Sequence, residues 1–158
     1  PLRLNTSLEP AEREQRINQT LRQVGMLPDH AYYYPHMLAS GQKQRVALAR
    51  ALILQPKVIV ADEALASLDM SMRSQIINLM LELQEKHGIS YIYVTQHLGM
   101  MKHISDQVLV MHEGEIVERG STAEVLAAPL HELTKRLIAS HFGEALTADA
   151  WRRDGGRF

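Results

Sequence analysis

The chain has 158 residues, 46% of them hydrophobic and 22% charged, which is the composition of an ordinary globular domain. Its net charge of −1 gives no strong attraction for nucleic acid or anionic lipid, and the lack of cysteine excludes disulfides and thiolate zinc sites. No apolar run approaches the roughly 20 residues that a membrane span requires. The chain begins at Pro1 without a methionine, which we interpret as a truncated N-terminus.

The first third of the chain predicts two helices separated by a loop. A helix is expected over 9–24, because apolar side chains recur on one face, Pro10 suits the first turn and Gly25 suits the exit. A loop through three tyrosines, 32–34, follows, and the second helix is expected over 40–54. The tyrosines could stack on bases, but a partly buried loop is preferred because no basic patch surrounds them.

Strands and helices alternate in the rest of the chain. The predicted elements are a strand over 57–61, a helix over 71–86, a buried parallel strand over 91–95, two strands over 107–111 and 115–119 joined by a tight turn, and two short helices over 122–127 and 131–140. The polar tail from Phe142 onward is expected to be mobile. This alternation predicts an α/β layer fold with a largely parallel sheet. The predicted segments are too few to flank the strand that ends at Asp62 on both sides, so we expect an uncovered apolar edge of the sheet.

A small-residue turn opens the second predicted helix. The N–H groups of Ser40, Gly41 and Gln42 lack partners inside the helix, and the helix dipole places partial positive charge there. Such a turn can hold a phosphate. A plain helix N-cap is the alternative for these three residues taken alone.

Two carboxylates end the apolar strand over 57–61. At the carboxyl end of a strand, side chains face the ligand crevice of an open α/β sheet. Asp62 suits Mg²⁺, held through water, and Glu63 suits orientation or deprotonation of an attacking water. A solvated acidic turn is the alternative for this pattern alone.

The order and spacing of the motifs favour the chemical interpretation. Gly41 precedes Asp62 by 21 positions (62 − 41), and Asp62 precedes Asp69 by 7 (69 − 62). A candidate switch region at Gln96 and His97 follows the next strand. The phosphate-binding pattern GxxxxGK[ST] occurs nowhere in the 158 residues.

Together with the helix that follows Gln42, these features resemble the ATP-binding cassette ATPases, and within them the ATP-binding subunits of oligopeptide and dipeptide importers. The strongest marker is 61–74, supported by 91–110 and by 129–137. The resemblance implies the C-terminal portion of a P-loop NTPase fold, with the end of the helical signature subdomain and the Walker B half of the parallel core sheet.

The resemblance also implies a division of the chain and a set of site residues. Residues 1–39 would be part of the helical subdomain, 40–127 the signature helix and catalytic core with Walker B, D-loop and switch region, and 128–158 a C-terminal helix and polar tail. The implied residues are Leu38, Ala39, Ser40, Gly41, Gln42 and Asp69 for ATP, Asp62 for Mg²⁺, and Glu63, Gln96 and His97 for catalysis.

Three positions depart from the family pattern. Ala39 lacks the hydroxyl that the usual LSGGQ signature offers to the γ-phosphate, although Ser40 can substitute one position later. Gln96 stands where a histidine is usual, and it cannot carry a positive charge. Ala64-Leu65 replaces a Pro-Thr pair. We therefore hypothesise an asymmetric heterodimer in which one or both nucleotide sites are slow.

The expected function is ATP-driven transport of peptides, or other small cationic cargo, at the cytoplasmic face of the bacterial inner membrane. The expected partners are a second ATPase subunit paired head to tail, two transmembrane permease subunits and, indirectly, a periplasmic binding protein, without nucleic acid. As a full-length subunit the protein would hydrolyse ATP, whereas these 158 residues alone would not. The alternatives are a soluble cassette ATPase acting on nucleic acid or ribosomes, and a non-catalytic fragment.

Overall fold

The computed structural model describes residues 1–142 and divides the chain into two compact units. The first unit spans Pro1–Val94 and the second begins at Thr95. Each unit has a two-stranded sheet of its own. The predicted polar tail lies outside the described residues beyond its first residue, Phe142, which ends the last helix.

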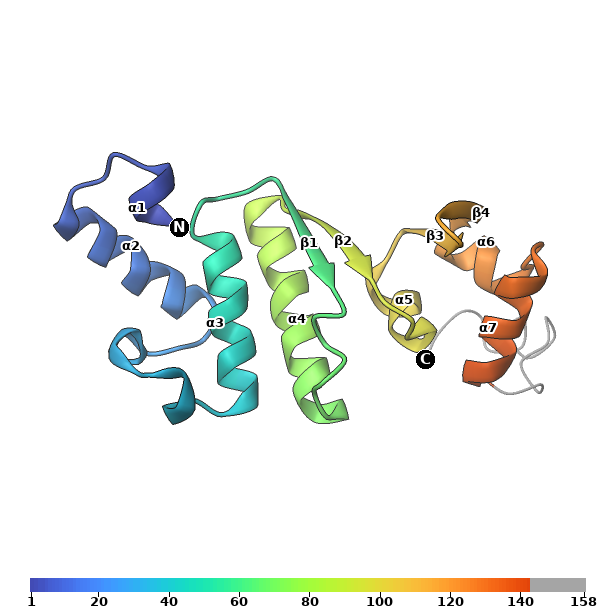
Figure 1. The fold of residues 1–158 in the computed structure, drawn as a ribbon, viewed down its shortest axis with the longest axis horizontal. Helices are drawn as coiled ribbons and strands as arrows, with labels where there is room; N and C mark the ends of the chain where they lie inside the picture. Colours follow the sequence, from blue (N-terminus) through green and yellow to red (C-terminus); the bar gives the residue numbers. More distant parts are fainter. Residues whose placement is uncertain (143–158) are drawn as a thin grey trace. The chain divides into compact units, whose positions relative to one another are not determined.

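Helices dominate the first unit. Its elements are α1 (Leu2–Asn5), α2 (Pro10–Gln23), the 3₁₀ turns η1 (Pro28–Tyr32) and η2 (Pro35–Met37), α3 (Ser40–Leu52), β1 (Val58–Asp62), α4 (Met70–His87) and β2 (Ser90–Val94). Figure 1 shows α3 lying between α2 and α4. The predicted helices and strands of this part are confirmed to within two residues at each end.

Two reciprocal hydrogen bonds from arginines hold α2 and α3 together, and we call this pair the arginine exchange. Arg45 of α3 donates from Nη1 to the carbonyl oxygen of Val24, the C-cap of α2, at 2.7 Å. Arg16 of α2 donates from Nε to the carbonyl oxygen of Ile53, the C-cap of α3, at 3.1 Å. Each arginine satisfies a carbonyl that a helix end leaves without an internal partner. Gly25, with φ +70°, gives the Arg45 guanidinium room, since a Cβ there would lie 2.8 Å from Nη1.

The sheet of the first unit is parallel and covered on one face only. Ile59 and Ala61 of β1 are buried, whereas Val58 and Val60 are 50% and 63% exposed. The register pairs Val60 with Ile92, so the exposed side chains of both strands share a face. The sequence predicted an uncovered apolar edge, whereas the exposed apolar side chains described here lie on one face of the sheet.

Two tyrosines of β2 complete the covered face. The rings of Tyr91 and Tyr93 stack with their centroids 5.6 Å apart. Burial raises the pKa of Tyr91 to about 12, so this phenol stays neutral over the physiological range.

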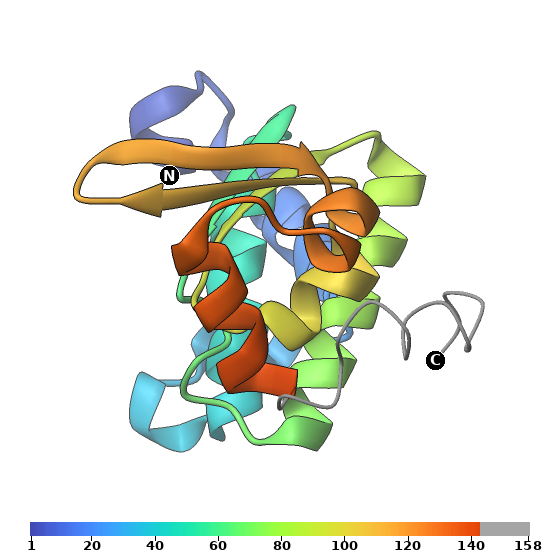
Figure 2. The ribbon, with the colours of Figure 1, turned by 90° about the vertical axis from the view of Figure 1, so that its right-hand side faces the viewer.

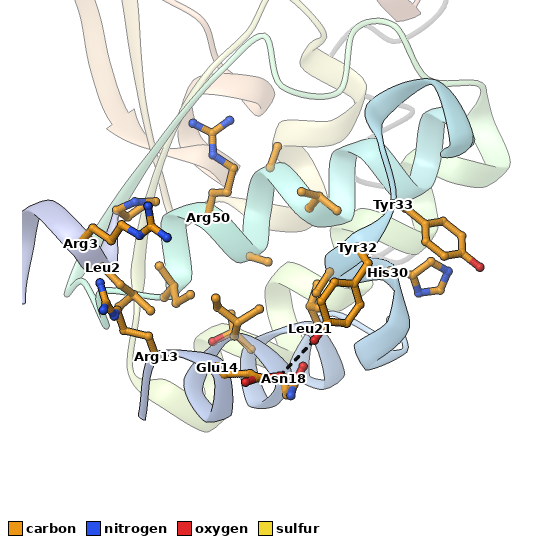
Figure 3. A pocket seen from close by; sticks show the side chains of 18 of the residues that line it. Leu2, Arg3, Arg13, Glu14, Asn18, Leu21, His30, Tyr32, Tyr33 and Arg50 are labelled. Atoms are coloured by element: carbon orange, nitrogen blue, oxygen red, sulfur yellow. Dashed lines mark hydrogen bonds between the residues drawn. The ribbon is translucent and has the colours of Figure 1, made fainter. Parts of the chain in front are cut away.

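The tyrosine loop differs from the expectation. Tyr32 and Tyr34 are 74% and 68% exposed, so the prediction of a partly buried loop is wrong for these two side chains. Tyr32 instead points along α2, where its hydroxyl donates to Glu14 Oε1 at 3.0 Å (Figure 3). Two short 3₁₀ turns, each begun by a proline, keep this segment on the surface.

An antiparallel hairpin organises the second unit. Its elements are α5 (Leu98–Ile104), β3 (Gln107–His112), β4 (Glu115–Ser121), α6 (Thr122–Ala127) and α7 (Glu132–Phe142). Figure 2 shows β4 running directly into α6 at one end of the hairpin. The predicted turn is confirmed, with Glu113 and Gly114 both at positive φ. The prediction of a largely parallel sheet therefore holds for the first unit alone, and α5 was not predicted.

Glu118 fastens α7 to the hairpin. Its two carboxylate oxygens accept the N–H groups of Leu130 and His131 at 2.8 and 3.0 Å, just before α7 begins. Burial works against ionisation, but these hydrogen bonds hold the pKa of Glu118 below its usual range.

The first prediction concerns the arginine exchange. Changing Arg45 to Gln removes the donor to Val24, and we expect the free energy of unfolding to fall by about 1.5–3 kcal/mol, the value of a hydrogen bond to a charged group. Arg22→Gln is the matched control, because Arg22 is an exposed arginine of α2. Denaturant unfolding of the full-length protein measures both, and equal stabilities would contradict this account of helix packing.

Candidate functional site

The first turn of α3 has no side-chain cap. Ala39 occupies the N-cap position, and its methyl group cannot accept the N–H groups that follow. Asp69 and Ser121 do accept such N–H groups at the starts of α4 and α6. The start of α3 therefore presents donors without a side-chain acceptor, which fits the phosphate-binding turn expected at Ser40 and Gly41.

The side chain of Gln42 is already used within the turn. Its Oε1 accepts the N–H of Ala39 at 2.9 Å, and its Nε2 lies 3.5 Å from Nε2 of His30. The other ring nitrogen of His30 lies 3.0 Å from the nitrogen and 3.2 Å from the oxygen of Leu27. Gln42 thus connects η1 to the start of α3. Leu38, just before the turn, is buried.

Asp62 and Glu63 lie where the sequence places them, at the carboxyl end of β1. Asp62 is the last strand residue and is exposed. Glu63 adopts φ +45°, a left-handed conformation that costs a non-glycine residue about 1–3 kcal/mol. Its N–H donates to the carbonyl of Val94 at 2.9 Å and its carbonyl accepts the N–H of Ala66 at 3.1 Å, and these bonds hold it there.

Asp62 offers a single exposed carboxylate at the carboxyl end of β1. Among residues 1–142 there is no cluster of three or more histidine, aspartate or glutamate side chains able to hold a metal. Mg²⁺ ordinarily uses one or two carboxylates together with phosphate oxygens and waters. Asp62 therefore fits Mg²⁺ as one ligand, with the remaining ligands supplied by phosphate and water.

The loop between Glu63 and α4 is held by two buried leucines. Leu65 and Leu68 are 4% and 6% exposed, so the Ala64-Leu65 departure places an apolar anchor where the family usually has threonine. Arg73 donates from Nη2 to the carbonyl of Leu68 at 3.1 Å. The turn that carries Asp69 is thus fixed from both sides.

Asp69 is the N-cap of α4, and it is linked to the start of α3. Its Oδ1 accepts the N–H of Met72 at 2.9 Å. The side chain of Met72 reaches Gly41, where an added Cβ would lie 1.6 Å from Met72 Cε. The start of α3 at Ser40–Gln42, which we call the signature turn, and the turn that carries Asp69 are therefore brought together through Met72. The sequence indicated no functional role for Met72.

Gln96 and His97 belong to the second unit. Val94, which pairs with Asp62, precedes Gln96 by two residues. The N–H of His97 donates to Thr95 Oγ1 at 3.1 Å, and His97 takes the N-cap position of α5. Its ring meets that of His141 edge to face, with the centroids 6.2 Å apart.

A groove of about 1120 Å³ lies on the helical part of the first unit. It is lined by α1, α2, the tyrosine segment and α3, as Figure 3 shows. Its wall contains Arg3, Arg13, Lys43 and Arg50 among mainly apolar side chains. No sequence pattern indicated this groove, because its walls come from four separate segments.

Comparisons of sequence and fold point to one family. A model of the ABC transporter family matches residues 2–66. The SapF proteins of Escherichia coli K12 and Salmonella typhimurium LT2 are each 82% identical to the chain over 154 residues. Over nearly its whole length the chain is similar to ATP-binding proteins of ABC transporters.

The names of these relatives describe different cargo. The first is named for a putrescine export system and the second for a peptide transport system. Each match covers 98% of this chain and 58% of the relative, so the chain spans somewhat more than half of their length.

Solved structures agree on the fold. The cbiO1 protein of Clostridium perfringens, part of an ABC transporter complex, is 33% identical with a TM-score of 0.69, over 91% of this chain and 57% of that one. The ATP-binding cassette MJ0796, solved as a dimer with ADP and Pi, is 27% identical with a TM-score of 0.62, over 75% of this chain and 50% of that one.

The second prediction concerns the cap of α4. Asp69→Ala removes the acceptor for Met72 N–H, and we expect a loss of about 1 kcal/mol in the free energy of unfolding. Asp69→Asn retains an acceptor oxygen and should match the wild-type stability closely. Urea unfolding of the full-length protein tests both variants, and an Ala variant as stable as the Asn variant would contradict the capping role.

Proposed function

We propose that the whole protein is an ATP-binding subunit that couples ATP binding and hydrolysis to transport across the bacterial inner membrane. The observation that carries the proposal is the uncapped start of α3 at Ser40 and Gly41, held against the turn of Asp69 in the same unit as the strand that ends in Asp62 and Glu63. The high identity to SapF proteins over nearly the whole chain supports it.

Each site residue has a defined task in this proposal. The N–H groups at Ser40 and Gly41 bind the terminal phosphate of a nucleotide held mainly by a second ATPase domain, while Asp69 lies at the boundary between the domains. Asp62 holds Mg²⁺, which supplies charge neutralisation at the phosphates when bound. Glu63 orients or deprotonates the attacking water, and Gln96 with His97 forms the switch beside the transferred phosphate.

The proposed pairing is head to tail, so each nucleotide lies between the signature turn of one domain and the core of the other. The dimer of MJ0796 with ADP and Pi is a related cassette found as a pair. Ala39 in place of the signature serine and Gln96 in place of the usual histidine favour an asymmetric heterodimer. Every helix in the described part of the chain is too short or too polar to cross a bilayer. In this proposal, permease subunits attach the protein at the cytoplasmic face.

We assign the contact with two permease subunits to the helical part of the first unit. The groove beside α2 is lined by basic and apolar side chains, and Tyr32 and Tyr33 are part of its wall. Peptides or other small cationic solutes such as polyamines are the proposed cargo, in keeping with the names of the SapF relatives. A periplasmic binding protein would act on the permeases and not on this chain.

The third prediction tests the proposed base. Glu63→Gln in the assembled full-length transporter should reduce ATP turnover by about 10²–10⁴-fold, the usual contribution of general base catalysis, while ATP binding is retained. Phosphate release and nucleotide binding measured on the same preparation separate the two effects. Glu82→Gln is the control, because Glu82 is an exposed residue of α4. Retained turnover in the Glu63 variant would contradict the assignment.

The fourth prediction tests the switch. Gln96→His restores a side chain that can carry positive charge, and we expect ATP turnover of the complete transporter to rise by roughly tenfold or more, within the range of positioned acid–base groups. Steady-state ATPase rates at saturating ATP measure this. A rate equal to that of the wild type would show that Gln96 does not limit the site.

A further inference from the structure

We propose that Met72 is a positioning residue for the nucleotide site, because it joins the signature turn to the turn that carries Asp69. The terminal methyl group of its side chain fills the space that a side chain at Gly41 would take. The proposal rests on the proposed function for the role of Gly41 toward nucleotide. The contact itself is a property of the first unit.

The backbone conformation does not explain why residue 41 is a glycine. The glycines at positive φ are Gly25, Gly88 and Gly114, and Gly41 is not among them. Gly41 lies in the first turn of α3 and is buried, and alanine is the better helix former there. The need for glycine at residue 41 is therefore steric, or it comes from the ligand.

The local geometry supplies the steric reason. An ideal Cβ on Gly41 would lie 1.6 Å from Met72 Cε and 3.2 Å from Met72 Sδ. Two carbon atoms of different residues cannot lie 1.6 Å apart, so a methyl group at residue 41 and the methyl group of Met72 compete for one place. Methionine is flexible, so the methyl group of Met72 would be the part that moves.

The other end of Met72 is fixed to the Asp69 turn. Its N–H donates to Asp69 Oδ1 at 2.9 Å, and the neighbouring Arg73 donates to the carbonyl of Leu68 at 3.1 Å. Met72 therefore contacts Asp69 through its backbone and Gly41 through its side chain. Displacement of either turn by the width of a methyl group breaks one of these contacts.

In the proposed function this contact makes the position of the signature turn depend on the position of the turn that carries Asp69 in the same chain. A signature turn that has lost the contact holds the terminal phosphate less well. The water-activating carboxylate of Glu63 is untouched by the change. Loss of the contact should therefore raise the ATP concentration needed for turnover and leave the maximal rate nearly unchanged.

The test is a double-mutant cycle in the full-length protein assembled with its partner subunits. The variants are Gly41→Ala, Met72→Leu and the two combined. Leucine keeps the apolar bulk of methionine but lacks the ε atom, so the combined variant moves a methyl group from residue 72 to residue 41. Met70→Leu is the matched control, because Met70 is 77% exposed in the same helical turn. KM for ATP, kcat and the thermal unfolding midpoint are measured for each.

Gly41→Ala alone should raise KM about tenfold with kcat within about twofold, and adding Met72→Leu should return KM to within about threefold of wild type, because contacting residues couple. Met70→Leu should change neither constant. A combined variant with KM as high as that of Gly41→Ala would show that the nucleotide requires the glycine, and would overturn the proposal. A lowered unfolding midpoint with unchanged KM would also overturn it, since the contact would then be structural only.

Failure of the proposed function is distinguishable from failure of this inference. If Glu63→Gln leaves turnover intact, the proposed function fails and so does the role of Met72 toward nucleotide. The unfolding midpoints still test the contact between Gly41 and Met72. A midpoint that recovers in the combined variant supports competition of the two methyl groups for one place, and a midpoint that does not recover contradicts it.

Discussion

The exchange of arginines between α2 and α3 is the constraint on which the site depends. Arg45 and Arg16 each reach from one helix to the last carbonyls of the other, at 2.7 and 3.1 Å. Each bond satisfies an acceptor that helical geometry leaves open and brings positive charge to the negative end of a helix. Because each helix supplies one donor and one acceptor, a shift of either helix changes the geometry of both bonds. The start of α3, and with it the signature turn, is positioned by this exchange.

The two ends of α3 differ in whether a side chain compensates the partial charge of the helix dipole. At its C-terminus the guanidinium of Arg16 neutralises the partial negative charge of the helix, whereas at its N-terminus Ala39 supplies no acceptor. The partial positive charge at Ser40 and Gly41 is therefore left uncompensated by any capping side chain. Ala39 thus leaves the backbone donors of this turn without a side-chain acceptor, and it also lacks the hydroxyl that a signature serine would add toward phosphate.

Local patterns in the sequence were sufficient for the elements but not for their contacts. The helix exit at Gly88 and the hairpin turn at Gly114 follow from single residues whose φ is positive, and both were predictable. The link from Met72 to Gly41 and the arginine exchange join residues more than twenty positions apart, and no periodicity encodes such pairs. The exposed Tyr32 was mispredicted for the same reason, since its partner Glu14 lies on another helix.

Three local structural costs lie where chemistry is proposed. Gly41 disfavours the helix that it opens by about 0.5–1 kcal/mol relative to alanine. Glu63 takes a left-handed conformation, and the first turn of α3 lacks a cap. Each cost is offset by a tertiary contact: the Met72 methyl at Gly41, the Val94 carbonyl at Glu63 and the arginine exchange along α3. At these three positions a departure from local preference is accompanied by a tertiary contact, which supports the proposed function there.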